Sequence, residues 1–191
     1  MKLIPLSCLL FSSLLLQGCA GILVAGAATS ATIVTDPRDS NQIWQDENVE
    51  LTVTGIGNRV PFSHNVRVSS SAYDGTVVLM GQAPSKELMN EFVAQIQQLD
   101  GVETLHNKMK IKPTLSLSEV SRDTWITTKI KASYLKHSEL SGVKIKVLTE
   151  DREVLLLGYA SQDQAKIATE IASNTIGVKH VIRSFQHPLS P

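Results

Sequence analysis

Two stretches decide the fold: Val77-Val78-Leu79-Met80-Gly81 and Val154-Leu155-Leu156-Leu157-Gly158. Each is a continuous apolar run that ends at a glycine, a pattern typical of a buried central strand. The two stretches lie 77 residues apart in a chain of 191 residues. Self-similarity at a fixed spacing indicates a repeated structural unit, so we expect two small domains.

Two further blocks repeat at nearly the same spacing. The segment 66–72 (VRVSSSA) aligns with 143–149 (VKIKVLT), again offset by 77 residues. The pair Gly101-Val102 aligns with Gly177-Val178 at an offset of 76 residues. The second copy has therefore lost one residue close to its helix.

The first copy predicts the order strand, turn, strand, helix, strand. Alternation over 66–72 indicates a strand with one face inward, and Asp74-Gly75 is a strong hairpin signal. A helix is expected to start at Pro84-Ser85 and to stop at Asp100-Gly101. The apolar stripe of this helix consists of Leu88, Phe92, Ile96 and Leu99. A last alternating strand follows, with the apolar residues Leu105, Met109 and Ile111.

The second copy predicts the same order. Its helix is expected from about Ser161 to Thr175, followed by a strand with Val181, Arg183 and Phe185 in alternation. A strand–helix–strand connection implies a parallel pair with a right-handed crossover. We therefore predict an α+β fold, in which each copy has a three-stranded mixed sheet with its helices on one face.

Each copy should also open with a helix. In the second copy Asp123 is a good N-cap for a helix that runs to about His137. In the first copy the equivalent segment, 49–60, contains Gly55, Gly57 and several β-branched residues. Low propensity predicts that this helix is short or distorted.

The N-terminus reads as an export signal over residues 1–18. Lys2 precedes an apolar run from Leu3 to Leu16, which is too short to span a bilayer but fits a signal peptide. The run ends at Leu16-Gln17-Gly18-Cys19, which resembles the lipobox of bacterial lipoproteins. The resemblance implies cleavage before Cys19 and acyl groups on that residue. The alternative is an ordinary signal peptide with a cysteine near its end.

We expect residues 19–45 to form the lipidated cysteine and a flexible tether, 46–113 the first domain and 119–188 the second. The segment 20–34 is small and apolar, and the alternative of a second transmembrane span needs more than its roughly fifteen residues. Residues 36–41 read as turn and linker. Ala20, in place of an aspartate, favours the outer membrane by resemblance to enterobacterial lipoproteins.

The repeat resembles the BON domain, a small αββαβ module of bacterial envelope proteins. The residues that match are the strand–glycine motifs 77–81 and 154–158 and the helix stops Gly101-Val102 and Gly177-Val178. With lipobox and tether, the chain resembles the dual-BON outer-membrane lipoproteins of proteobacteria. That family implies phospholipid binding and envelope integrity without catalysis. One departure is Asp151-Arg152, which replaces the Asp-Gly turn, and the other is the weak opening segment of the first copy.

Neither composition nor motifs favour an enzyme. The five histidines are scattered, and the sequence has no glycine-rich phosphate loop, no nucleophile elbow and no zinc-protease motif. We therefore expect no catalytic residue, no metal and no cofactor other than the acyl groups on Cys19. The formal net charge is zero, which argues against nucleic acid as a partner.

The segment 123–137 offers the candidate surface. At 100° per residue Ile126, Ile130 and Tyr134 share one face, which should lie in the core. The candidate lipid-binding residues are Trp125, Thr128, Ala132 and Leu135 on the opposite side, with Lys129 and Lys136 along one edge and Lys131 along the other. A helix of this composition is typical of membrane surfaces.

Two interpretations of Trp125 compete with lipid contact: packing between the domains, or a partly covered position on the core. The leading functional hypothesis is an outer-membrane lipoprotein that binds phospholipid, expected to be anionic because of the lysines beside Trp125, and maintains the integrity of the envelope. The alternative is a periplasmic adaptor that binds envelope assembly or wall-remodelling proteins. In the first copy the stretch 49–60 has Arg59 as its one cation and no aromatic residue. We therefore expect lipid binding in the second copy.

Overall fold

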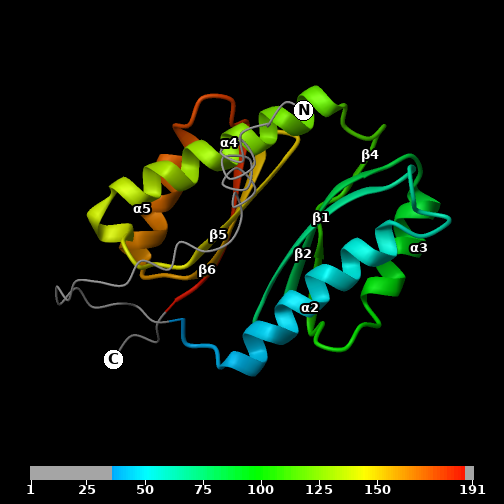
Figure 1. Ribbon diagram of the computed structural model, residues 1–191, viewed down its shortest axis with the longest axis horizontal. Coiled ribbons are helices and arrows are strands. Elements are labelled where there is room, and N and C mark those ends of the chain that lie inside the picture. The colour runs from blue at the N-terminus through cyan, green and yellow to red at the C-terminus, as the bar shows by residue number, and fades with distance from the viewer. Residues whose placement is uncertain (1–35, 188–191) are drawn as a thin grey trace, which may run out of the picture. The chain divides into compact units, whose positions relative to one another are not determined.

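The computed structural model describes residues 36–187. The first module contains α2 (Ser40–Gly57), β1 (Arg67–Tyr73), β2 (Thr76–Ala83), α3 (Lys86–Ile96), β3 (Thr104–Asn107) and β4 (Lys110–Ile111). The second contains α4 (Leu117–Lys136), a short 3₁₀ turn η2 (Ser138–Leu140), β5 (Ile145–Glu150), β6 (Glu153–Tyr159), α5 (Gln162–Ser173) and β7 (His180–Gln186) (Figure 1). The predicted α+β fold with two αββαβ modules is confirmed.

The export signal, Cys19 and most of the expected tether lie outside the described residues. Within residues 36–187, no helix combines the length and the apolar character that crossing a bilayer requires.

The central strands, β2 and β6, contain the repeated apolar stretches 77–81 and 154–158. In the first module β2 pairs antiparallel with β1 and parallel with β3 and β4. In the second module β6 pairs antiparallel with β5 and parallel with β7. The last strand of the first module is interrupted, because the Asn107 side chain accepts a hydrogen bond from the Met109 backbone N–H at 2.9 Å. The expected alternation therefore stops at Met109, and Ile111 is exposed.

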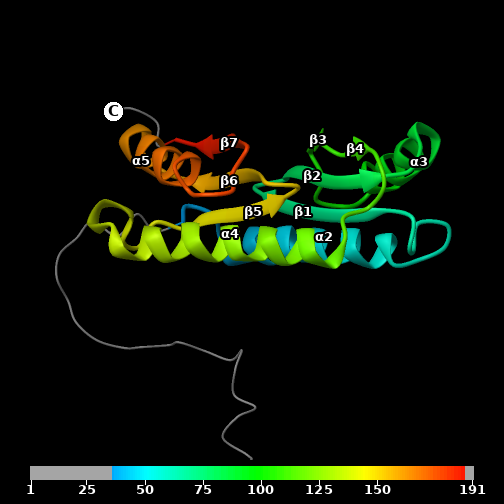
Figure 2. The same cartoon turned by 90° about the horizontal axis from the view of Figure 1, so that it is seen from above.

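The apolar central strands serve both faces of their sheets. Val77 and Leu79 belong to the core that the first module forms with α2 and α3. Val154 and Leu156 do the same with α4 and α5. The residues between them, Val78, Met80 and Leu155, form a third cluster that joins the helix-free faces of the two sheets. A helix also runs along the first strand of each sheet, α2 beside β1 and α4 beside β5 (Figure 2).

A glycine near the end of each central strand is required by the neighbouring strand, although both strands continue beyond it, to Ala83 and to Tyr159. Gly81 and Gly158 both have positive φ, at 142° and 143°. A Cβ at Gly81 would overlap the carbonyl oxygen of Arg67, and one at Gly158 would lie 2.5 Å from the carbonyl oxygen of Lys144. The glycine of the repeated strand–glycine motif is therefore required because two backbones approach closely at this position.

Both opening helices start earlier than predicted. α4 begins at Leu117 behind a capping box formed by Ser116 and Glu119, so the prediction that Asp123 is its N-cap is wrong. α2 begins behind Asp39 and runs for 18 residues, so the prediction of a short or distorted helix is also wrong. Gly55 and Gly57 stand in the last turn, where they do not interrupt the helix.

The segment expected to be a linker is attached to the first module. Ser40 and Asn41 are already helical. Arg38 forms ion pairs with Asp36 and with Asp46, each at 2.6 Å, and its guanidinium lies 3.7 Å from the centre of the Tyr73 ring. The prediction of a free linker over 36–41 is therefore wrong.

Asp46 and Asp123 hold the hairpin turns of their modules. The Asp46 carboxylate accepts hydrogen bonds from the backbone N–H groups of Asp74 and Gly75, at 2.7 and 3.1 Å. Asp123 accepts the equivalent bonds from Asp151 and Arg152, at 2.6 and 3.0 Å. Asp151 and Arg152 both have positive φ, 52° and 66°. The second turn thus keeps the hairpin geometry without a glycine.

Candidate functional site

The core face of α4 is as predicted. Ile126 and Ile130 are fully buried and Tyr134 is almost so. The Tyr134 hydroxyl donates to the carbonyl oxygen of Ala168 in α5 at 2.9 Å, and burial raises the pKa of this phenol. These contacts fix the rotation of α4, so its opposite face must point to solvent.

All seven candidate lipid-binding residues are exposed. Trp125 is 46% exposed and Leu135 is 87% exposed, while the lysines and the small residues of the set are also at the surface. The Lys129 ammonium lies 5.3 Å from the centre of the Trp125 indole, within the range of a cation–π contact. Trp125 is therefore not a core residue, and it is absent from the apolar cluster that joins the two sheets.

The structure divides these seven residues between two sides of α4. Trp125, Lys129 and Lys136 line a groove between α4 and α5, together with Ile171 and Ile176. Thr128, Lys131, Ala132 and Leu135 do not line this groove. Ile176, which is 82% exposed in the loop after α5, was not among the residues predicted from the sequence. Its only signal was an apolar residue directly before the Gly177-Val178 helix stop.

The first module has a groove in the equivalent place. It lies between α2 and the loop after α3 and is lined by Trp44, Asn48, Leu99 and Asp100 among others. Trp44 is 67% exposed. This tryptophan was not predicted from the sequence, because the opening helix was expected to start only at Val49. Among residues 36–187, no lysine or arginine lines this groove.

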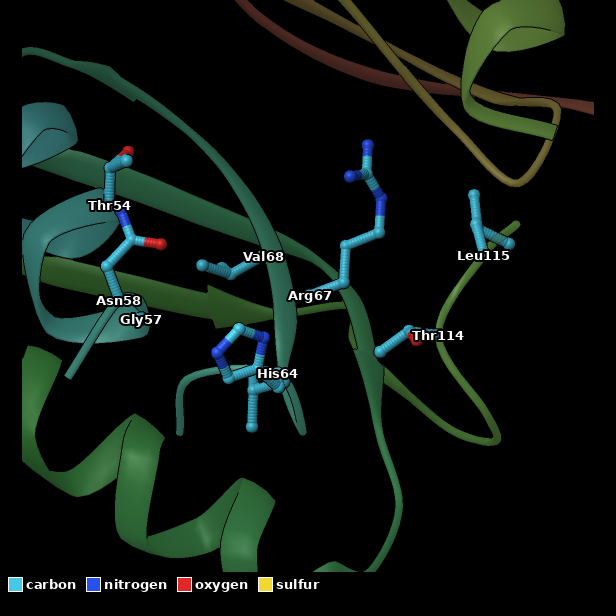
Figure 3. Close-up of a pocket in the computed structure, with 9 residues that line it drawn as sticks. Thr54, Gly57, Asn58, His64, Arg67, Val68, Thr114 and Leu115 are labelled. Atoms are coloured by element: carbon cyan, nitrogen blue, oxygen red, sulfur yellow. The ribbon is translucent and has the colours of Figure 1, made fainter. Parts of the chain in front are cut away.

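A second, polar hollow lies beside α2. Thr54, Asn58, His64, Arg67 and Thr114 are among its lining residues (Figure 3). The Arg67 guanidinium is already bound to the buried Glu150 carboxylate at 2.9 Å. Because that carboxylate neutralises the Arg67 charge, the hollow is a poor candidate for anion binding.

The fold and the repeat match a known family. The BON domain model matches residues 45–113 and 122–186. The chain belongs to the BON-domain family. It is also 33% identical over 183 residues to the outer membrane lipoprotein DolP of Haemophilus influenzae, covering 95% of both chains. The resemblance that the strand–glycine motifs and helix stops suggested is thereby confirmed.

Two other similarities accompany this one. The chain is 34% identical over 149 residues to the 21 kDa hemolysin of Actinobacillus pleuropneumoniae, covering 78% of this chain and 77% of that one. Among solved structures, the C-terminal domain of CdsD from Chlamydia trachomatis aligns with 76% of this chain and 67% of its own, at 16% identity and a TM-score of 0.30. The relationship to DolP confirms the expected class, a dual BON-domain lipoprotein anchored in the outer membrane.

Proposed function

We propose that this lipoprotein binds anionic phospholipid through α4 of its second BON module and thereby supports the integrity of the outer membrane. One observation carries the proposal. Trp125 is held outward, next to Lys129, on a helix whose other face is locked into the core. The role is one of binding, with no catalytic step and no cofactor beyond the acyl groups proposed for Cys19.

The binding free energy expected for α4 is small, which suits a membrane contact that supplements the acyl anchor proposed for Cys19. A lysine near an anionic surface contributes about 1 kcal/mol, and partial insertion of Trp125 and Leu135 adds about 2–4 kcal/mol from apolar area. That total supports only weak binding by a free domain. Acyl chains on Cys19 would hold the module at high effective concentration beside the membrane, so weak binding suffices.

Charge favours the second module over the first. Both modules expose a tryptophan over the groove between their helices, Trp44 in one and Trp125 in the other. Lys129 and Lys136 border only the second groove, whereas Asp100 borders the first. An anionic lipid surface should therefore attract α4 and not α2.

The test uses Trp125→Glu with Trp44→Glu as its matched control. Residues 36–191 contain both hydrophobic cores and no cysteine, so this chain should fold without the anchor. We expect Trp125→Glu to abolish binding to phosphatidylglycerol vesicles with an unchanged circular dichroism spectrum, since surface substitutions cost little stability. Trp44→Glu should bind as the wild type does.

Two results would count against the proposal. Normal vesicle binding by Trp125→Glu would remove lipid contact through this residue. If that variant also lost a protein partner from envelope assembly or wall-remodelling machinery, the adaptor role would replace the lipid role. Unfolding of the variant would instead show that Trp125 supports the packing of the module.

A further inference from the structure

The Trp44 groove of the first module is bordered by a row of polar side chains on α2. Asn41, Gln45, Asn48 and Thr52 line it beside the indole. At 100° per residue these four positions fall within about 60° of one another, so they form one row along the helix. Asn41 and Thr52 are about 16 Å apart along the helix axis. The row is therefore long enough to contact an extended ligand.

Contacts on the other side of α2 fix the direction of this row. Val49 and Val53 are buried in the core of the first module. The Asp46 carboxylate is bound to the backbone of the hairpin turn. Because these contacts hold the helix, Trp44 and Gln45 remain exposed beside the core.

The loop after α3 forms the other wall of the groove. Gly101 packs against α2, because a Cβ at this position would lie 2.8 Å from Cγ of Gln45. The φ of Gly101 is 87°, a value that favours glycine. This close packing keeps Leu99 and Asp100, the two residues before the glycine, at the groove.

The groove carries little charge. Among residues 36–187, Asp100 is the one charged residue that lines it. Arg38, just before α2, is bound to Asp36 and Asp46, each at 2.6 Å, so its charge is neutralised. An anionic ligand would meet the Asp100 carboxylate with no cation to balance the repulsion. The side-chain amides of the row instead offer both donors and acceptors to an uncharged polar ligand.

An exposed indole beside side-chain amides fits a sugar ring. One face of a pyranose ring presents C–H groups, which the negative face of an indole attracts. Hydroxyl and acetamido groups at the rim of the ring can exchange hydrogen bonds with amides, and a carboxylate accepts the stronger ones. Leu99 packs partly on the core and lines the same groove, so it offers an apolar contact to an acetamido methyl group. A lipid chain would leave the amides of the row without partners.

We propose that the Trp44 groove binds a glycan strand of N-acetylated hexosamines. One sugar ring stacks on Trp44, Gln45 and Asn48 bond to its acetamido group, and Asp100 accepts a hydrogen bond from a hydroxyl. A lipoprotein anchored in the outer membrane lies next to the cell wall, whose strands have this chemistry, so the cell wall is the source of the ligand. The site does not depend on lipid binding by α4.

The test is a titration of isotope-labelled residues 36–191 with the tetramer of N-acetylglucosamine, followed by NMR. We expect saturable shifts of the amide signals of 41–52 and 99–101 and of the Trp44 indole N–H. Trp44→Ala should weaken binding about tenfold, because the sugar loses the indole on which it stacks. Asn48→Ala should weaken binding about fivefold, the effect of one hydrogen bond. The spectra of both variants also report whether they are folded.

Trp125→Ala is the matched control, because it removes the exposed tryptophan of the other module. It should bind the tetramer as the parent does. An absence of saturable shifts would overturn the proposal, and so would equal affinities of Trp44→Ala and Trp125→Ala. Shifts of the same α2 signals with phosphatidylglycerol vesicles, but not with the sugar, would make the groove a lipid contact and would overturn it as well.

A sedimentation assay tests the source of the glycan. Purified cell-wall sacculi should carry down the parent and Trp125→Ala, and less of Trp44→Ala. Equal amounts of the three proteins in the pellet would contradict cell-wall binding through this groove. Lipopolysaccharide, another glycan of the envelope, should leave the α2 signals unchanged, and shifts of those signals would contradict the cell wall as the source.

Discussion

Arg67 in the first module and Glu150 in the second form an ion pair between the modules, with Arg67 Nε 2.9 Å from Glu150 Oε1. The Glu150 side chain is 2% exposed. It also accepts hydrogen bonds from the Ser69 hydroxyl and the Gln82 amide, both at 3.0 Å. A buried charge of one module is therefore satisfied by donors from the other.

Glu150→Ala should lower the free energy of unfolding by about 3 kcal/mol. Removing one partner of a buried ion pair leaves the other unpaired, here together with the Gln82 amide. Urea unfolding of residues 36–191 measures the loss. Glu153→Ala is the control, because its partner Lys110 is 40% exposed and such pairs contribute about 0–1 kcal/mol. Equal losses in the two variants would contradict this assignment.

Asp151 should make the protein less stable in acid. Burial alone would raise the pKa of its carboxyl, but the hydrogen bond from Lys112 and the positive charges of Lys112, Lys179 and Lys110 lower it below 3.8. A lowered pKa in the folded state stabilises the protein above the unfolded value, and this stability is lost as the pH falls through the folded value. Asp151→Asn should therefore lose less stability than the wild type between pH 7 and pH 3. Urea midpoints at the two pH values provide the comparison, and an unchanged difference would refute it.

Asp123→Asn should destabilise the second module by about 1–3 kcal/mol, since each carboxylate oxygen accepts one turn N–H and the amide NH2 that replaces one of them cannot accept a hydrogen bond. Burial raises the pKa of Asp123. Its contribution to stability is therefore largest below the unfolded pKa and falls as the pH rises through the folded pKa. Thermal unfolding at pH 4 and pH 7 should show that acidification changes the stability of Asp123→Asn less favourably than that of the wild type, because the variant lacks this contribution. Asp163→Asn, in the exposed first turn of α5, should behave like the wild type.

The lysines that border the groove should produce the salt dependence of lipid binding. Lys129→Gln with Lys136→Gln removes two charges worth about 1 kcal/mol each, so affinity for phosphatidylglycerol vesicles should fall more than tenfold. Raising the salt concentration should weaken binding of the wild type more than that of the double variant. Salt screens the attraction of Lys129 and Lys136 to the anionic vesicle, and the double variant lacks both charges. Lys108→Gln with Lys166→Gln, in other parts of the surface, is the control pair. A common salt dependence for the wild type and the double variant would count against the site.

Cys19→Ala should release the protein from the membrane fraction and abolish labelling with palmitate. The motivation is the Leu-Gln-Gly-Cys sequence after an apolar run at the N-terminus. Fractionation and metabolic labelling of cells that express the variant would check both effects. Continued labelling would show that another residue carries the acyl groups.

The repeat made most of the fold predictable. The strand–glycine motifs, the hairpin turns and the later helices were all readable from local patterns, because each depends on residues close in sequence. The start of α2 was not, since its attachment involves Arg38, Asp46 and the Tyr73 ring, which only the folded module brings together. Asp123 read as an N-cap for a similar reason: its partners in the turn at 151–152 lie 28 and 29 residues away.

The candidate site was predictable in part. The core stripe of α4 fixed which side chains point outward, and Trp125 is exposed as that stripe requires. Helix periodicity cannot show which neighbour borders each edge of a helix. The groove beside Lys129 and Lys136 and the approach of Ile176 depend on how α5 packs, through Tyr134 and Gly177.

The contact between the helix-free faces of the two sheets has a consequence for the order of folding. Val78 and Met80 are almost fully buried, and their cover is Leu155 of the second module. The first module precedes the second in the chain, so its apolar patch stays exposed to water until the second module has folded against it. A chain that ends after the first module would leave this patch uncovered, and an exposed apolar patch favours aggregation.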